Sequence, residues 1–236
     1  MPARRPAAAC GALLAALAVP AAAEAASFTA PLKPCYVTAG TQARPQTEGF
    51  PVAGTGFGTN STVSLAIDGT PVPNGGALQA DAAGNVVLPD TLVPSPWIRA
   101  GQRDFTITLT DNMVPGVVAT ATSKVTALAV NVKPRVAKPS DKVRFTGSGF
   151  TGAAPVYAHY VHGGKLKKTV RMAGKPGVCG TWSAKRKQIP VRRAKTGRWI
   201  VQFDQAHRYR SGIKGGVNGV YVRLSIDVRI KRERRG

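Results

Sequence analysis

Apolar and polar residues alternate along much of this 236-residue chain, in short runs between clusters of Gly, Pro, Asn and Asp. Residues 63–67 form one such run, and Asp68-Gly69 then supplies the two positive-φ residues that a tight hairpin turn needs. In the run 220–231, Val, Leu and Ile occupy every second position. This alternation predicts strands with one face on a core and the other in water. No helical apolar period occurs after the first 26 residues, so we predict an all-β protein.

An internal repeat divides the chain. The sequence Gly-Thr-Gly-Phe at 54–57 recurs as Gly-Ser-Gly-Phe at 147–150, an offset of 93, and Asp111 and Asp204 are related by the same offset. A period near 93 residues is too long for a solenoid repeat and is typical of an immunoglobulin-like sandwich. We therefore predict two immunoglobulin-like β-sandwich domains in tandem.

The start of the chain has the pattern of a secretory signal. Arg4 and Arg5 precede an apolar stretch at 7–19 and a run of small residues at 21–26, after which Ser27 would begin the mature protein. The alternative is a retained membrane anchor, but this Ala-dominated run is short for a span, and no later stretch is long and apolar enough to cross a bilayer. We predict a secreted, extracellular or envelope-associated protein.

The domains that follow are predicted to comprise residues 27–130 and residues 131–236, the second ending in a basic tail. Strand-like sequence runs from Lys124 to Val132 without a Gly- or Ser-rich linker. One domain's last strand would then pass almost directly into the next domain's first strand. This arrangement predicts a stiff junction.

The two Gly-x-Gly-Phe turns and the Asp-Ala-Ala-Gly-Asn turn at 81–85 give the chain a family likeness. It resembles secreted bacterial tandem immunoglobulin-like proteins of the IPT/TIG kind, over most of the mature chain. The resemblance implies a surface, adhesive or polysaccharide-binding spacer. The motifs that carry it are turns, so it supports the fold more than the function. The second copy departs from the pattern with basic insertions and with Trp182 and Trp199.

Cysteine pairing is left open by the sequence. Cys10 lies in the leader, which leaves Cys35 and Cys179 in the mature chain. An oxidising compartment and an even count favour a disulfide between them, which would fix the two domains relative to each other. The alternative is two separately buried small side chains.

Charge is distributed very unevenly between the two predicted domains. Residues 27–130 hold five Lys or Arg and six acids, whereas residues 131–236 hold 26 basic residues and four acids. Because the two copies share turns and strand spacing, the charge is not needed to form the fold. A strongly positive surface raises the local concentration of anions, so it indicates an anionic partner.

The partner predicted for the second domain is an anionic polymer: teichoic acid, acidic polysaccharide, a phospholipid surface or extracellular DNA. Clusters of basic residues are the candidate anion-binding site, because guanidinium and ammonium groups bind phosphate, sulfate and carboxylate. The residues singled out are Arg192, Arg193, Lys195, Arg198, Arg208, Arg210, Lys165, Lys167 and Lys168. The run from Arg229 to Arg235 would add a basic arm.

One alternative competes with this prediction. The basic surface could be a solvated face on an adhesive or spacer module that binds a protein or a neutral glycan through exposed Trp182 or Trp199. Those tryptophans could instead belong to the core, since Trp199 lies in an alternating run.

No motif predicts catalysis. Gly147-x-Gly149-x-x-Gly152 matches a dinucleotide fingerprint but leads into a strand, not a helix. His159 and His162 would face opposite sides of a strand, so they cannot share a metal ion without a bulge in that strand. We therefore predict a protein that is not an enzyme and has no catalytic residues, metal or small-molecule cofactor. A hydrolase with an unrecognised site is the remote alternative.

Overall fold

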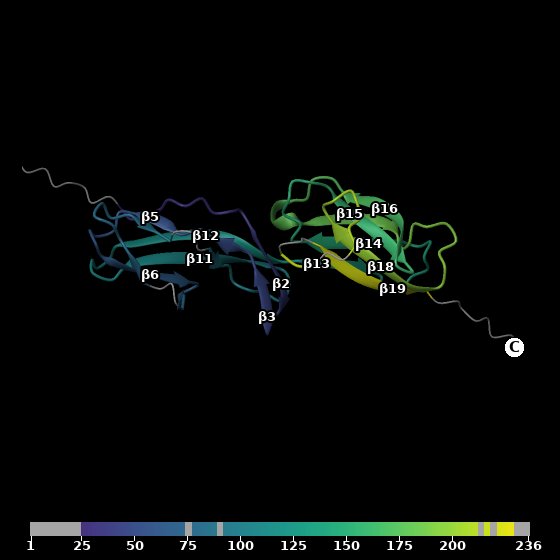
Figure 1. Cartoon of the computed structure of the whole chain (residues 1–236), viewed down its shortest axis with the longest axis horizontal. Coiled ribbons are helices and arrows are strands. Elements are labelled where there is room, and N and C mark those ends of the chain that lie inside the picture. Colours follow the sequence, from purple (N-terminus) through teal and green to yellow (C-terminus); the bar gives the residue numbers. More distant parts are fainter. Residues whose placement is uncertain (1–24, 74–76, 89–91, 212–214, 218–220, 229–236) are drawn as a thin grey trace, which may run out of the picture.

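The computed structural model describes residues 25–73, 77–88, 92–211, 215–217 and 221–228. Within these ranges the chain forms nineteen strands and one short 3-10 helix, arranged as two immunoglobulin-like sandwiches in series (Figure 1). The all-β tandem fold is therefore confirmed. Almost all of the predicted leader, and the basic arm from Arg229 to Arg235, lie outside the described residues.

The first sandwich contains twelve strands. One sheet has the order β3-β2-β12-β11-β6-β7, with β8 also paired to β6, and the short sheets β1-β5-β9 and β10-β4 complete the sandwich. Tyr36, Phe50 and Phe105 meet in its core, with ring centroids 5.8 to 6.0 Å apart. The strands are β1 (Ser27–Phe28), β2 (Tyr36–Thr41), β3 (Arg44–Thr47), β4 (Gly49–Phe50), β5 (Ala53–Thr55), β6 (Thr62–Ile67), β7 (Thr70–Pro71), β8 (Ala77–Gln79), β9 (Val86–Val87), β10 (Val93–Pro94), β11 (Gln102–Asp111) and β12 (Val118–Ala127).

The second sandwich packs a three-stranded sheet, β13-β14-β17, against a four-stranded sheet, β16-β15-β18-β19. The ring centroid of Phe145, from the first of these sheets, lies 5.7 Å from that of Phe203 in the other sheet. The ring centroids of Trp182 and Phe203 are 6.0 Å apart. The elements are β13 (Ala129–Lys133), β14 (Lys142–Ser148), β15 (Val156–His162), β16 (Lys165–Ala173), η1 (Val178–Gly180), β17 (Trp182–Lys187), β18 (Gly197–Asp204) and β19 (Val222–Val228).

The predicted hairpin turn at Asp68-Gly69 has the positive φ values that its residues suggested, and three other turns share this conformation. Asp68 and Gly69 have φ values of 49° and 77°, and the β15–β16 hairpin turns at Gly163 and Gly164 with φ values of 57° and 72°. The central glycines of the two Gly-x-Gly-Phe motifs have φ values of 84° and 83°. In β19 the apolar positions pack against the core while the alternating polar positions are exposed, as predicted.

The repeat breaks down after β18. The segment between β11 and β12 covers residues 112–117, whereas the segment between β18 and β19 covers residues 205–221. The longer connection in the second sandwich accommodates one of its basic insertions. The extra residues therefore explain why the offset of 93 ends at Asp204.

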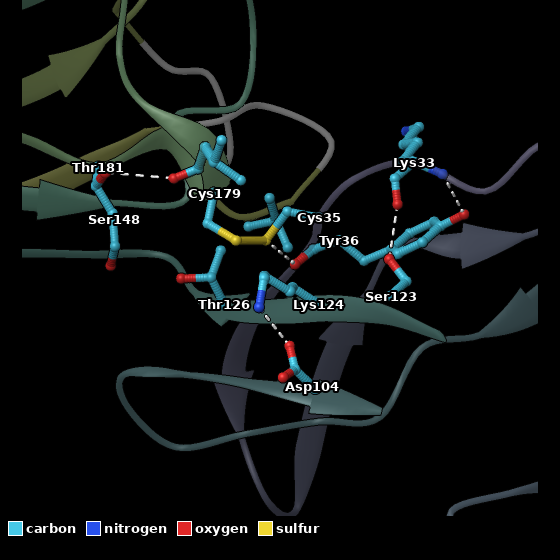
Figure 2. The surroundings of a disulfide bond; sticks show 12 residues. Lys33, Cys35, Tyr36, Asp104, Ser123, Lys124, Thr126, Ser148, Cys179 and Thr181 are labelled. Atoms are coloured by element: carbon cyan, nitrogen blue, oxygen red, sulfur yellow. Dashed lines mark hydrogen bonds and ion pairs between the residues drawn. A yellow bond between two sulfur atoms is a disulfide. The ribbon is translucent and has the colours of Figure 1, made fainter. Parts of the chain in front are cut away.

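Only Leu128 separates β12 from β13 at the junction of the sandwiches. Its backbone N–H donates to the Thr38 carbonyl at 2.7 Å, and the Ser148 hydroxyl donates to the Ala127 carbonyl at 2.6 Å. A disulfide between Cys35 and Cys179 adds a covalent link across the junction, with the Cα atoms 5.1 Å apart (Figure 2).

Candidate functional site

Lysines and arginines of the first sandwich are largely neutralised by acids. Three of its five basic residues make ion pairs, and each carboxylate comes from another part of the same sandwich. These pairs are Lys33 with Glu48 at 3.7 Å, Arg103 with Asp68 at 2.6 Å and Lys124 with Asp104 at 2.6 Å. The surface of the first sandwich is therefore close to neutral locally as well as in total.

The basic residues of the second sandwich are not paired with acids in this way. Among its described residues, no Lys or Arg makes an ion pair with a carboxylate. Asp141 accepts a hydrogen bond from the Lys138 backbone N–H at 2.9 Å, and Asp204 is buried in contact with His159. The described cations of this sandwich are thus not neutralised by direct ion pairs.

Five of these cations share the solvent face of the β13-β14-β17 sheet. In β14 the side chains of Val143 and Phe145 point into the core, so Lys142 and Arg144 point outward. Strand pairing sets Lys133 of β13 and Lys185 of β17 on either side of Arg144, and sets Lys187 opposite Lys142. We call Lys133, Lys142, Arg144, Lys185 and Lys187 the basic face.

The spacing of the basic face follows from sheet geometry. Neighbouring strands lie about 4.8 Å apart, and residues two positions apart along a strand are separated by about 6.8 Å. All five side chains are exposed. The remaining outward positions on these strands include Asn131, Thr146 and Ser183, which are neutral. The basic face is therefore a compact grid of positive charge without a carboxylate.

None of these five residues was among those singled out from the sequence. Lys133, Lys142 and Arg144 stand apart from the obvious basic runs, and Lys185 and Lys187 belong to a basic run that was not chosen as part of the site. They converge only when β14 pairs with β13 on one side and β17 on the other. The alternation Lys142-Val143-Arg144-Phe145 was the available signal, since it marks a strand that is basic on its outer face.

A cavity of about 610 Å³ lies beside the basic face. Four cations line it: Lys168 of β16, Lys187 of β17, and Arg192 and Arg193 of the segment that follows β17. Ile189, Pro190 and Val191 are among the other lining residues. The structure thus brings together three of the residues predicted from the sequence, and Lys187 belongs to both the cavity and the basic face.

The segment 188–196, which carries Arg192 and Arg193, is held at both ends. At its start the Ile189 N–H donates to the Pro139 carbonyl at 2.9 Å. Near its end the Lys195 carbonyl accepts a 2.9 Å hydrogen bond from Trp199 Nε1. Ile189 and Trp199 are both 1% exposed, so the segment is anchored on the core.

Other predicted site residues lie elsewhere. Arg198 is on the outer side of the four-stranded sheet, where its guanidinium donates to the Ser225 hydroxyl at 2.9 Å. Arg208 and Arg210 flank Tyr209, whose ring lies 5.7 Å from that of His159 on the same sheet. These three arginines are therefore on the opposite side of the sandwich from the basic face. Lys165 and Lys167 are exposed on β16, and Lys195 is exposed in the anchored segment.

A buried polar network crosses the four-stranded sheet. His159 Nε2 donates to Asp204 Oδ1 at 3.1 Å, and Nδ1 lies 2.9 Å from the Thr169 hydroxyl. Gln202 donates to Asp204 at 2.7 Å and accepts from Arg223 at 3.0 Å. Burial raises the pKa of Asp204, but the hydrogen bonds it accepts outweigh that effect and leave it lowered. His159 is thus fully hydrogen-bonded within the fold.

Metal-ligating clusters of three or more His, Cys, Asp or Glu do not occur among the described residues. In the same part of the chain, no helix has the length and apolar character needed to cross a bilayer.

The tryptophans do not form an exposed platform. Trp182 is 8% exposed and Trp199 is 1% exposed, and both pack in the core of the second sandwich. Their assignment to the core is confirmed, and the alternative in which they bind a partner at the surface is wrong. Each ring packs against another aromatic ring. The ring centroids of Trp182 and Phe150 are 5.9 Å apart, and those of Trp199 and His162 are 4.8 Å apart.

No protein-family model matches this chain, and no curated protein matches it. Among solved structures, a tetra-tandem repeat from the extending region of a large adhesion protein is 14% identical, with 85% of this chain and 47% of that chain covered and a TM-score of 0.27. The eight N-terminal immunoglobulin domains of Down syndrome cell adhesion molecule are 10% identical, with 87% and 24% covered and a TM-score of 0.28.

A third solved structure is SGBP-B of the Bacteroides ovatus mixed-linkage glucan utilization locus, in complex with a mixed-linkage heptasaccharide. It is 16% identical, with 86% of this chain and 46% of that chain covered and a TM-score of 0.21. The present chain spans less than half the length of each of these three chains.

Proposed function

We propose that this chain is a secreted or envelope-associated binding protein, not an enzyme, whose second sandwich binds an anionic polymer. The observation that carries the proposal is the basic face, in which Lys133, Arg144 and Lys185 form a row across three strands with Lys142 and Lys187 beside it. No carboxylate neutralises them within the described residues. The first sandwich would act as a spacer or as a separate contact module.

Cation spacing favours cooperative binding of a polyanion. Neighbouring residues of the basic face have backbone positions about 5 to 7 Å apart, which is less than the Debye length of about 8 Å at physiological salt. Their fields therefore add, whereas 22 net charges spread evenly over the domain would act almost singly. A polymer that binds such a grid releases its condensed counterions, so affinity should fall steeply as salt rises.

Electrostatic repulsion within the basic face supports a binding role over a structural one. Like charges directly opposite each other on neighbouring strands destabilise a sheet. The first sandwich forms with a net charge near zero, so this fold does not require the cations. A feature that opposes folding and recurs at five positions is best explained by a partner that relieves the repulsion.

The chemistry of the basic face favours polymers without nucleobases. Its described outward positions carry Lys, Arg, Asn, Thr and Ser but no aromatic side chain. Proteins that bind single-stranded nucleic acid use aromatic side chains as stacking platforms for the bases. We therefore place polymers rich in phosphate or sulfate groups, such as teichoic acid or an acidic polysaccharide, ahead of single-stranded nucleic acid.

Heparin chromatography of the full chain tests this proposal. We expect retention that is lost as salt rises, and earlier elution of the triple variant Lys133→Gln, Arg144→Gln, Lys185→Gln. Elution of that variant at the same salt concentration as the wild type would refute the role of the basic face. Binding to a protein or neutral-glycan partner that survives high salt would instead support an adhesive module with incidental charge.

A further inference from the structure

The cavity beside the basic face is strongly charged. It concentrates Lys168, Lys187, Arg192 and Arg193 around one space of about 610 Å³. We infer that this cavity is a discrete site for one phosphate- or sulfate-bearing unit, held through its tetrahedral oxyanion. The inference rests on the proposed function, because the unit would belong to the anionic polymer bound by the basic face.

The four cations are free to meet a ligand. No carboxylate lines the cavity, and none of the four makes an ion pair among the described residues. Asp141 is next in sequence to the lining residue Ser140, but its carboxylate accepts a hydrogen bond from the Lys138 backbone N–H. Its backbone carbonyl accepts another from the Gln188 N–H at 2.9 Å. Asp141 therefore stabilises the turn and does not neutralise the cations of the cavity.

The side chains present suit an oxyanion of high charge. A guanidinium offers planar pairs of N–H donors to phosphate or sulfate oxygens, and a lysine ammonium adds a mobile point charge. Arg192 and Arg193 supply the first kind, and Lys168 and Lys187 the second. The apolar residues Pro190 and Val191 would contact the organic part of the unit. Four positive groups around one space can meet oxygens that point in several directions, which suits a tetrahedral phosphate or sulfate better than a planar carboxylate.

The backbone segment that carries Arg192 and Arg193 is already fixed by hydrogen bonds without a ligand. Segment 188–196 is tied to the Pro139 carbonyl through Ile189 and to Trp199 through the Lys195 carbonyl. The His162 ring adds a contact to the Thr196 carbonyl, with Nε2 and the oxygen 3.1 Å apart. Ordering of Arg192 and Arg193 on binding therefore involves their side chains far more than their backbone, which lowers the entropic cost.

Backbone conformation singles out Arg193. Its φ is 52°, in the left-handed region that non-glycine residues rarely adopt. Glycine would be the default residue at such a position, and strained residues cluster at binding sites. An arginine at such a position, lining a cavity with three other cations, supports a use for its side chain.

Lys187 connects the cavity to the surface where the polymer is proposed to lie. It is paired with Lys142 across β14 and β17, and it also lines the cavity with Lys168. A chain lying along the basic face could therefore place one of its charged groups in the cavity without leaving the face. The face would supply affinity for polymers in general, and the cavity would select for the oxyanion.

Titration calorimetry of the full chain with inorganic phosphate, with sulfate and with acetate tests the cavity. We expect saturable binding of phosphate or sulfate, and the two arms show which oxyanion is preferred. Arg192→Gln and Arg193→Gly should each weaken binding about tenfold or more, since each removes a charge-assisted contact. Arg193→Gly should melt at the same or a higher temperature than wild type, so a loss of binding would not reflect unfolding.

Two matched variants separate this inference from the proposed function. Arg208→Gln removes one charge on the opposite side of the sandwich and should leave phosphate binding unchanged. The triple variant Lys133→Gln, Arg144→Gln, Lys185→Gln should bind the polymer more weakly yet keep phosphate binding. If the wild-type chain binds phosphate but is not retained on heparin, the cavity site would be upheld and the proposed polymer binding would be refuted. Acetate binding as tight as phosphate binding, or no saturable binding, would overturn the cavity site.

Discussion

Arg144 of β14 lies directly opposite Lys185 of β17, and Lys133 of β13 lies opposite Arg144 on its other side. Three cations thus form a row across a three-stranded sheet, with no acid between them among the described residues. Each direct pair of like charges in a sheet opposes folding. The second sandwich therefore folds despite its basic face, and the balance between stability and charge can be measured.

Removing the central charge should stabilise the protein. We expect Arg144→Thr to raise the free energy of unfolding by about 0.5 kcal/mol at low salt, because two like-charge pairs disappear and threonine suits a strand. The gain should shrink as salt screens the repulsion. Urea unfolding at low and high salt measures it, with Arg171→Thr on β16 as the control. A gain that is independent of salt would attribute the effect to strand propensity alone.

The disulfide between Cys35 and Cys179 should contribute strongly to stability. It joins residues 144 positions apart across the two sandwiches, so it restricts the unfolded chain as a whole. Replacing both cysteines by serine should lower the free energy of unfolding by about 2 to 5 kcal/mol. Denaturant unfolding with and without reductant measures this effect. The double variant should be insensitive to reductant, and equal sensitivity in wild type and variant would contradict the bridge.

Glycine at position 180 is required by close packing. Its φ is 66°, and a Cβ there would lie 2.1 Å from the Phe150 backbone nitrogen. Gly164 has a similar φ of 72°, but a Cβ there would meet nothing within 4 Å. Gly164→Ala should therefore lower stability by about 1 kcal/mol through backbone strain alone, and Gly180→Ala by clearly more. Thermal melting of both variants compares them, and equal losses would refute the packing argument.

Asp111 should make stability depend on pH in acid. Burial raises its pKa, but hydrogen bonds from the Ser61 hydroxyl and from backbone N–H groups such as Gly58 outweigh this and hold it at about 2, against an ordinary value of 3.8. The folded state then binds the proton more weakly than the unfolded state. Its stabilising effect is complete above pH 3.8 and is lost as pH falls toward 2.

Asp111→Asn tests that assignment. The amide keeps the size of the side chain but loses charge-assisted hydrogen bonds, so we expect the free energy of unfolding at neutral pH to fall by about 2 kcal/mol. The difference between wild type and variant should narrow as pH falls from 4 to 2. Urea unfolding across this pH range measures it. A constant difference would show that the carboxylate charge is not involved.

Much of the fold could be predicted because its signals are local. The alternation that defines β6 and β19, and the glycines of the hairpin at Gly163-Gly164, act over a few neighbouring residues. Burial of Trp199 was one of two alternatives, because alternation alone does not show which face meets the core. The sequence left the Cys35 and Cys179 pairing open for a similar reason, since the contact depends on how the two sandwiches meet.

The basic face could not be located by searching for runs of charge. Lys133, Arg144 and Lys185 are far apart in sequence, and only the register of β13, β14 and β17 brings them into one row. Conversely, arginines that are close in the sequence need not act together. Arg192 and Arg198 belong to one basic stretch but lie in different surroundings. Strand pairing is a long-range property, so it decides which charges gather.

The salt dependence of polyphosphate binding by the full chain compares the two possible anion surfaces most directly. One triple variant replaces Lys133, Arg144 and Lys185 by glutamine, and the other makes the same change at Arg198, Arg208 and Arg210. We predict that the first variant binds more weakly and that its plot of log K against log salt is shallower by about 2 to 3, while the second changes much less. Equal losses in the two variants would contradict the basic face, because total charge alone would then control binding.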